Sequence, residues 1–178
     1  MPNSKPSTKA SNLLKQQKAI KSLLSKESDL GGVLIATSFI DDCLKSLLHT
    51  HLLDDSKVAQ KLLDSSSGVF GSFSVKNDVL YCLGSYGKKT YQDLNKTAEI
   101  RNIFAHHHLT ANFKNNDVIK LCAELKSPNI YLEAQVDKSN YGDLVVHFKS
   151  AKVCFIHTVA SLSDSLLQTI ISAEHHRI

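Results

Sequence analysis

The fold class follows from residues 29–53, DLGGVLIATSFIDDCLKSLLHTHLL. Apolar side chains recur here every three or four residues, which places them on one face of an α-helix. Either Ser28 or Asp29 can supply the side-chain oxygen that caps the first turn. The helix predicted over about 28–53 buries one stripe: Leu30, Val33, Leu34, Thr37, Ile40, Leu44, Leu47, Leu48, His51 and Leu52.

The same spacing predicts helices along most of the chain, at about 12–26, 56–63, 73–83, 88–107, 116–125 and 150–175. Residues 130–136 and 144–148 alternate between apolar and polar side chains instead, which is typical of β-strands, and residues 137–143 form a turn between them. We therefore predict a mainly α protein, a multi-helix bundle with a small β-hairpin near residues 129–148.

The composition is that of an ordinary globular protein, with 42% hydrophobic and 21% charged residues. No stretch approaches the roughly 18 uninterrupted apolar residues of a membrane span. The first residues, Met1 to Pro6, are not followed by the apolar core of a signal peptide. We therefore expect a cytoplasmic protein with no membrane partner.

Positive charge is concentrated at the N-terminus, because residues 1–26 contain six lysines and no acidic residue. Residues 1–11 are rich in Ser, Pro, Asn and Lys and are predicted to form a disordered basic arm, followed by a single helical domain over 12–178. Such an arm can contact nucleic acid or an acidic partner, or it can serve only as a solvated tail. The sequence leaves both open.

The four cysteines are widely spaced, each in an apolar run, and no two form a Cys-x-x-Cys pair. This pattern predicts buried free thiols rather than disulfides or a zinc site. The sequence also lacks a glycine-rich phosphate loop and a dinucleotide fingerprint. We therefore expect no cofactor and no metal. The four cysteines are Cys43, Cys82, Cys122 and Cys154.

The most distinctive segment is RNIFAHHH, residues 101–108. Projection of the helix over 91–107 puts apolar residues on two sides, so the helix is buried between neighbours and Arg101 is partly buried. By the same projection Asp41 falls inside the apolar stripe of the 29–53 helix, whereas Asp42 falls outside it. Because a buried charge needs a partner, the sequence predicts an ion pair between Asp41 and Arg101.

Four blocks in order resemble the mannitol operon repressor (MltR) family of bacterial helical proteins: Leu34–Leu48 with Ile-Asp-Asp inside it, Gly71-Ser72-Phe73-Ser74-Val75-Lys76, Leu80–Gly84 and Ile100–His106. The resemblance covers about residues 30–125. In the second block Gly71 permits a turn and Ser72 caps the helix that Phe73 anchors. The resemblance implies a repressor or co-repressor that acts through another protein, such as a DNA-binding regulator. The sequence itself contains no helix-turn-helix with a basic recognition helix, so contact with nucleic acid is expected to be weak or indirect.

The segment Arg101-Asn102-x-x-x-His106 also resembles the Arg-x4–6-His motif of HEPN domains, many of which are metal-independent ribonucleases. That resemblance implies His106 as general acid/base, Arg101 as stabiliser of phosphorane charge, Asn102 as phosphate-orienting residue, and a homodimer. The alternative is that Arg101 and His106 only lock a helix end. Adjacent histidines diverge by about 100° on a helix, so His106, His107 and His108 do not predict a metal site. We rank the regulator first and the ribonuclease second.

Overall fold

The computed structural model describes residues 8–24, 26–52, 57–107, 109–127 and 150–175. Every regular element within these ranges is a helix, so the predicted mainly helical fold is confirmed. The β-hairpin predicted near residues 129–148 lies outside the described residues. The helices are α1 (Thr8–Leu24), α2 (Asp29–Thr50), α3 (Lys57–Leu62), α4 (Phe73–Cys82), α5 (Lys88–His106), α6 (Asn116–Ala123) and α9 (Ala151–His175).

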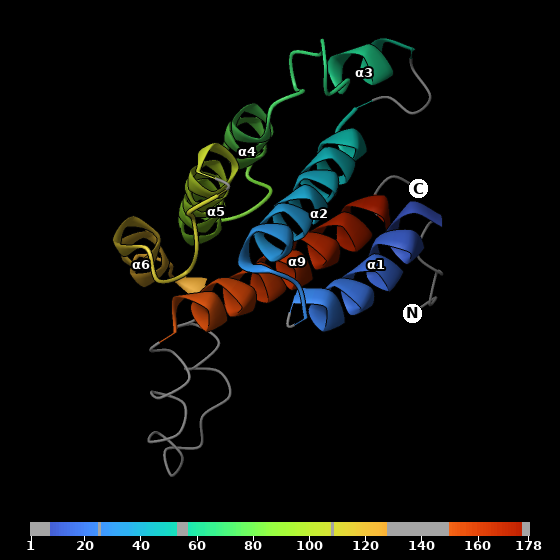
Figure 1. The fold of residues 1–178 in the computed structure, drawn as a ribbon. Coiled ribbons are helices and arrows are strands. Elements are labelled where there is room, and N and C mark those ends of the chain that lie inside the picture. Colours follow the sequence, from blue (N-terminus) through green and yellow to red (C-terminus); the bar gives the residue numbers. More distant parts are fainter. Residues whose placement is uncertain (1–7, 25, 53–56, 108, 128–149, 176–178) are drawn as a thin grey trace.

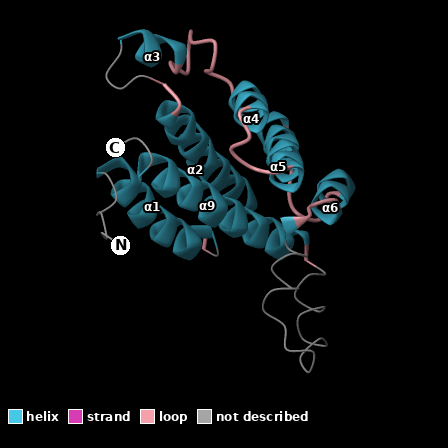
Figure 2. Ribbon diagram, turned by 180° about the vertical axis from the view of Figure 1, so that it is seen from behind, coloured by secondary structure: helices cyan, strands magenta, loops and turns pink. Residues whose placement is uncertain are grey.

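Helices α2 and α9 pack against each other more extensively than any other pair and form the centre of the molecule (Figure 1). Helix α1 packs on both of them, while α4 and α5 pack on each other and on α2. Helix α6 contacts α5 and α9. Seen from behind, α1 and the α4–α5 pair lie on opposite sides of the central helices (Figure 2).

The start of α2 is fixed by Ser28, whose side chain accepts a hydrogen bond from Gly31 N at 3.1 Å. Of the two capping residues that the sequence allows, Ser28 is therefore the one used. Asp29 instead binds two distant segments, because its carboxylate lies 2.9 Å from Lys152 Nζ and accepts a hydrogen bond from Phe113 N at 3.1 Å. These contacts tie the beginning of α2 to α9 and to the segment before α6.

The hydrophobic core lies where α2, α5 and α9 meet. The rings of Phe104, Phe113 and Phe155 pack in sequence, with centroids 5.2 and 5.5 Å apart. Each fully buried leucine or phenylalanine contributes about 1.5–3 kcal/mol of transfer free energy, so the buried core as a whole is a major source of the free energy of folding. The buried residues of the two central helices include Val33, Ile40, Leu44, Leu47, Leu48, Phe155, Leu162, Leu166 and Ile170.

Several details of the predicted helices are wrong, including His51, which was expected in the buried stripe but is exposed at the C-cap of α2. Helix α1 begins at Thr8 rather than near residue 12, so residues 8–11 belong to the helix and not to the arm. The reason is packing, because Ala10 is fully buried one turn before Leu13 on the same face. On α2, Leu34 was expected inside the buried stripe but is 39% exposed, because it lies at the edge of two hollows described below.

Residues 151–174 of α9 are long and apolar enough to cross a membrane by length and composition alone. Half of the most apolar window is buried inside the structure. The core helix of a helical bundle has the same properties, and α9 packs on α1, α2, α5 and α6. The apolar character of α9 is therefore explained by its central position.

Candidate functional site

The loop before α4 has one tightly determined shape. Asp64 Oδ1 accepts hydrogen bonds from the backbone N–H groups of Ser66 at 2.8 Å and Ser67 at 2.9 Å, and from both hydroxyls. These bonds, led by the one from the Ser66 hydroxyl, lower the pKa of Asp64 to about 2. A Cβ on Gly68 or Gly71 would lie 2.4 or 2.7 Å from a backbone oxygen, so both positions need glycine. The shape of this loop therefore determines where α4 begins.

Helix α4 begins where the sequence predicts, because Ser72 is its N-cap and accepts a hydrogen bond from Val75 N at 3.3 Å. Phe73, directly after the cap, is buried as the predicted anchor. The helix is also tied to α5 through the buried Asn77, whose amide donates to Tyr91 O and to Asn95 Oδ1. These contacts fix the face that α4 turns toward α2.

That face carries Lys76, which is only 1% exposed. Its ammonium group donates a hydrogen bond to Gly71 O at 2.8 Å and lies 3.0 Å from Asp41 Oδ1 of α2. Asp41 Oδ1 is buried yet accepts no hydrogen bond within the described part of the chain, so its contact with Lys76 is an ion pair without hydrogen-bond alignment. Asp41 is thus the only carboxylate that neutralises this buried lysine among the described residues.

The predicted ion pair between Asp41 and Arg101 is therefore replaced by the pair between Asp41 and Lys76. The helical projection correctly turned Asp41 toward the neighbouring helices, and its side chain is 34% exposed. It could not show that Lys76 would reach the carboxylate first. Within the described ranges no ion pair joins Asp41 to Arg101.

Asp41 and Arg101 nevertheless line the same cavity, which has a volume of about 360 Å³ and lies between α2, the start of α4 and α5. Arg101 is half-buried, and no carboxylate of the described residues lies within ion-pair distance of it. Three of the four blocks that carry the family resemblance meet at this cavity. Its lining residues are Leu34, Thr37, Ser38, Asp41, Gly71, Ser72, Phe73 and Arg101.

The other two residues of the Arg-x4-His motif do not share this cavity. Asn102 and His106 are exposed, and neither lines it. Of the three residues that the HEPN resemblance implies, only Arg101 lines the cavity. The motif in this chain has one residue in a cavity and two on the open surface.

A shallow apolar groove of about 510 Å³ lies beside the cavity, between α1 and α2. The two hollows share Leu34 and Ser38 in their walls. Burial, together with the nearby charge of Asp41, raises the pKa of Asp42 in the groove wall. The groove is lined by Gln16, Ile20, Leu23, Leu34, Ile35, Ser38, Phe39 and Asp42.

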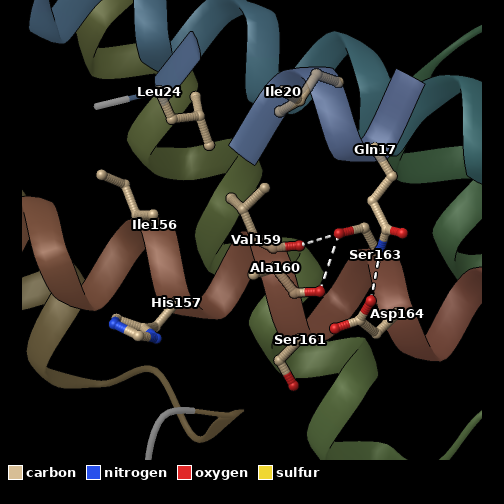
Figure 3. A pocket seen from close by; sticks show the side chains of 10 residues that line it. All are labelled: Gln17, Ile20, Leu24, Ile156, His157, Val159, Ala160, Ser161, Ser163 and Asp164. Atoms are coloured by element: carbon tan, nitrogen blue, oxygen red, sulfur yellow. Dashed lines mark hydrogen bonds between the residues drawn. The ribbon is translucent and has the colours of Figure 1, made fainter. Parts of the chain in front are cut away.

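Another cavity, of about 240 Å³, lies between α1 and α9 (Figure 3). Gln17 Nε2 donates to Asp164 Oδ1 at 2.5 Å across its polar end, and the Ser163 hydroxyl donates to the carbonyl of Val159. These polar groups are bonded within the chain, and much of the remaining wall is apolar. We therefore place the candidate functional site at the cavity lined by Arg101.

Metal-ligand groups are scattered: among the described residues no three His, Cys, Asp or Glu side chains are grouped to hold an ion. Cys43 and Cys122 are buried as predicted, and burial raises the pKa of each thiol to about 12. Cys154 is half-buried. The prediction was wrong for Cys82, which is exposed because it lies off the face of α4 that buries Lys76, Asn77 and Leu80.

Sequence reasoning missed Lys76, although a signal was present. Phe73, Lys76, Asn77 and Leu80 are spaced as one helical face, and all four are buried. Helical projection of α4 places Lys76 on this core-facing surface. The usual expectation that lysines are solvated concealed it.

Comparison with known proteins gives a family and a fold. The family model described as "Mannitol repressor" matches residues 15–163. No curated protein matches the sequence. A chain in the X-ray structure of the MtlR–HPr complex from Escherichia coli is 15% identical with a TM-score of 0.62, covering 85% of this chain and 98% of that chain. The crystal structure of a possible transcriptional regulator, YggD from Shigella flexneri 2a str. 2457T, is 14% identical with a TM-score of 0.64, covering 86% and 97%. At these identities the likeness to the two structures concerns the fold.

Proposed function

Because the chain belongs to the mannitol repressor family, we propose that it is a transcriptional regulator that acts through another protein and does not read DNA itself. The observation that carries this proposal is the family match, which extends over residues 15–163 and so includes every element around the cavity. The fold neighbour from Escherichia coli is a complex of MtlR with HPr. We take an HPr-type protein as the partner class for this chain.

The ion pairs of Lys96 on α5 support indirect rather than direct action on DNA. On α5, Lys96 lies 3.2 Å from Glu99 and 2.9 Å from Glu124 of the segment after α6, so its charge is locally neutralised. A DNA-reading helix needs cations that are free to approach phosphates and bases. The acidic groups beside Lys96 therefore make this part of α5 better suited to contact with a protein than with DNA.

The test is a pair of binding measurements on the purified full-length protein. Calorimetric titration with HPr from the same organism should give saturable binding with one stoichiometry. A DNA-retardation assay with the operator region at about 200 mM salt should give no tight, specific complex, because contacts made by a basic arm alone weaken steeply with salt. Tight operator binding without any HPr binding would reverse the proposal.

The exposed positions of Asn102 and His106, outside the cavity that Arg101 lines, do not favour the ribonuclease alternative. The homodimer implied by the HEPN resemblance stays a prediction. Light scattering of the purified protein measures it directly.

A further inference from the structure

Arg101 is a half-buried cation that lacks a counter-ion within the described residues, although a carboxylate lines the same cavity. The Asp41 carboxylate is already matched to the buried ammonium of Lys76, 3.0 Å away. The described charges next to the cavity are therefore one neutralised pair and one unmatched guanidinium. A guanidinium presents five N–H donors in a rigid planar fork that matches a carboxylate with two parallel hydrogen bonds.

The cavity does not end at Arg101, because Leu34 and Ser38 belong both to its wall and to the wall of the groove between α1 and α2. Leu34 is 39% exposed and Leu23, on the far wall of the groove, is 40% exposed. Two partly exposed leucines in one groove form an apolar surface that a partner side chain can cover. Cavity and groove thus make one continuous face across α1, α2, α4 and α5, which we call the Arg101 face.

We propose that the Arg101 face is the docking surface for the protein partner, which places an acidic side chain on Arg101 and an apolar side chain over Leu34 and Leu23. This inference rests on the proposed function and adds to it the site and the chemistry of contact. The partner is a folded protein whose contact surface carries a carboxylate beside exposed apolar residues.

Charge complementarity also sets the orientation of the partner. The unmatched cation Arg101 lines the cavity, and the carboxyl of Asp42 lies in the wall of the adjoining groove. An acidic group of the partner is attracted to Arg101 and repelled from Asp42. Opposite signs at two places on an interface select one orientation and disfavour others.

A protein suits this face better than a small anion does. The apolar groove, with about 510 Å³, adjoins the cavity of about 360 Å³, whose lining mixes polar and apolar residues, and a small anion on Arg101 would leave the groove empty. A typical specific interface buries about 800 Å² on each partner and combines an apolar centre with a few charged anchors. The Arg101 face offers both components side by side.

The test measures HPr affinity for two variants with matched controls. Arg101→Gln removes the unmatched charge, and Lys89→Gln removes one exposed charge from the other end of the same helix. Leu34→Gln alters the shared wall, and Leu109→Gln makes the same change at a leucine that is 89% exposed and lines neither hollow. Circular dichroism melts confirm that each variant is folded before titration.

We expect Arg101→Gln and Leu34→Gln each to weaken HPr binding about tenfold or more, as central anchors do, with both controls within about twofold of the wild type. Arg101→Lys should lose part of the affinity, because it keeps the charge without the planar fork. The loss for Arg101→Gln should shrink at high salt, since screening weakens the charge contact.

Three outcomes overturn the inference in distinguishable ways. A wild-type protein that does not bind HPr removes the proposed function and the docking face with it. A wild-type protein that binds HPr as tightly as all variants do removes only the docking face. Inorganic phosphate that raises the melting temperature of the wild type but not of Arg101→Gln, with HPr affinity unchanged in that variant, identifies a small-anion site instead.

Discussion

Replacing Asp41 with asparagine should destabilise the fold strongly, because it leaves the ammonium of Lys76 buried without a counter-ion. Lys76 is 1% exposed, and within the described part of the chain its other polar contact is the carbonyl of Gly71 at 2.8 Å. A neutral amide at position 41 keeps the size of the side chain and removes its charge. The experiment therefore isolates the electrostatic contribution of the pair.

The magnitude follows from the geometry. Two unit charges 3.0 Å apart interact with about 5 kcal/mol at an effective dielectric constant of about 20. Because the side chain of Asp41 is 34% exposed, solvent screens part of this energy. Breaking a buried pair by removing one partner costs about 3–5 kcal/mol in general, so we expect Asp41→Asn to lower the free energy of unfolding by about 2–4 kcal/mol.

The opposite substitution should cost less. Lys76→Met replaces a buried cation with an apolar side chain of similar length and leaves the Asp41 carboxylate with partial access to water. We expect Lys76→Met to lower the free energy of unfolding by about 1 kcal/mol. The double variant, with Asp41→Asn and Lys76→Met together, should be about as stable as Lys76→Met alone, because the buried ammonium is absent from both. The asymmetry between the two single variants is the specific signature of a buried lysine paired with a half-exposed acid.

Urea unfolding followed by far-ultraviolet circular dichroism measures these differences, with Asp42→Asn as the control. Burial and the charge of Asp41 raise the pKa of Asp42, so its ionised form is disfavoured in the folded state and protonation at low pH relieves this cost. Asp42→Asn should therefore leave stability unchanged or slightly raised at neutral pH. A cost below about 1 kcal/mol for Asp41→Asn, or equal and additive costs for the two single variants, would refute the reasoning.

Four further outcomes are expected. Asp93→Ala should lower stability by about 3 kcal/mol or more in urea unfolding, because the buried carboxylate accepts hydrogen bonds from Lys126 N, Ser127 N and the Ser127 hydroxyl. Gly71→Ala should cost about 1–3 kcal/mol, since the new Cβ would lie 2.7 Å from a backbone oxygen; a melting temperature equal to that of the wild type would contradict this. The hydrogen bonds that lower the pKa of Asp64 to about 2 stabilise the folded loop at pH values above the usual pKa of 3.8, and this stabilisation is lost as the pH falls through about 2. Acid unfolding of the wild type and of Asp64→Asn measures this difference. RNA incubated with the protein in EDTA should remain intact, and fragments ending in 2′,3′-cyclic phosphate would restore the ribonuclease alternative.

Periodicity alone predicts the helices of the described residues, because a helix that packs on a core must repeat its apolar residues every three or four positions. The stripe of α2 illustrates this, with Ile40, Leu44 and Leu47 fully buried as expected. Capping chemistry fixed the start of α4 at Ser72 for the same local reason. These features depend on neighbours within one turn, so one sequence is enough to find them.

The candidate site depends on distances between helices, which periodicity does not contain. Projection placed Asp41 and Arg101 on inward faces, and both do line one cavity. Which cation reaches the carboxylate depends on how α4 lies against α2. In the structure Lys76 of α4 lies 3.0 Å from Asp41, and no local pattern in the sequence encodes that distance.

The buried lysine is what leaves Arg101 available to a partner. Asp41 and Arg101 line the same cavity and carry opposite charges, so without Lys76 the carboxylate is free to pair with the guanidinium, as the helical projection predicted. The ammonium of Lys76 is buried, so water weakens its attraction to the Asp41 carboxylate less than it weakens that of the half-buried Arg101. Asp41 therefore pairs with Lys76 and not with Arg101. Lys76→Met should therefore release Asp41 toward Arg101 and weaken partner binding while the fold persists. The stability of the fold and the binding of the partner would then both depend on whether Asp41 pairs with Lys76 or with Arg101.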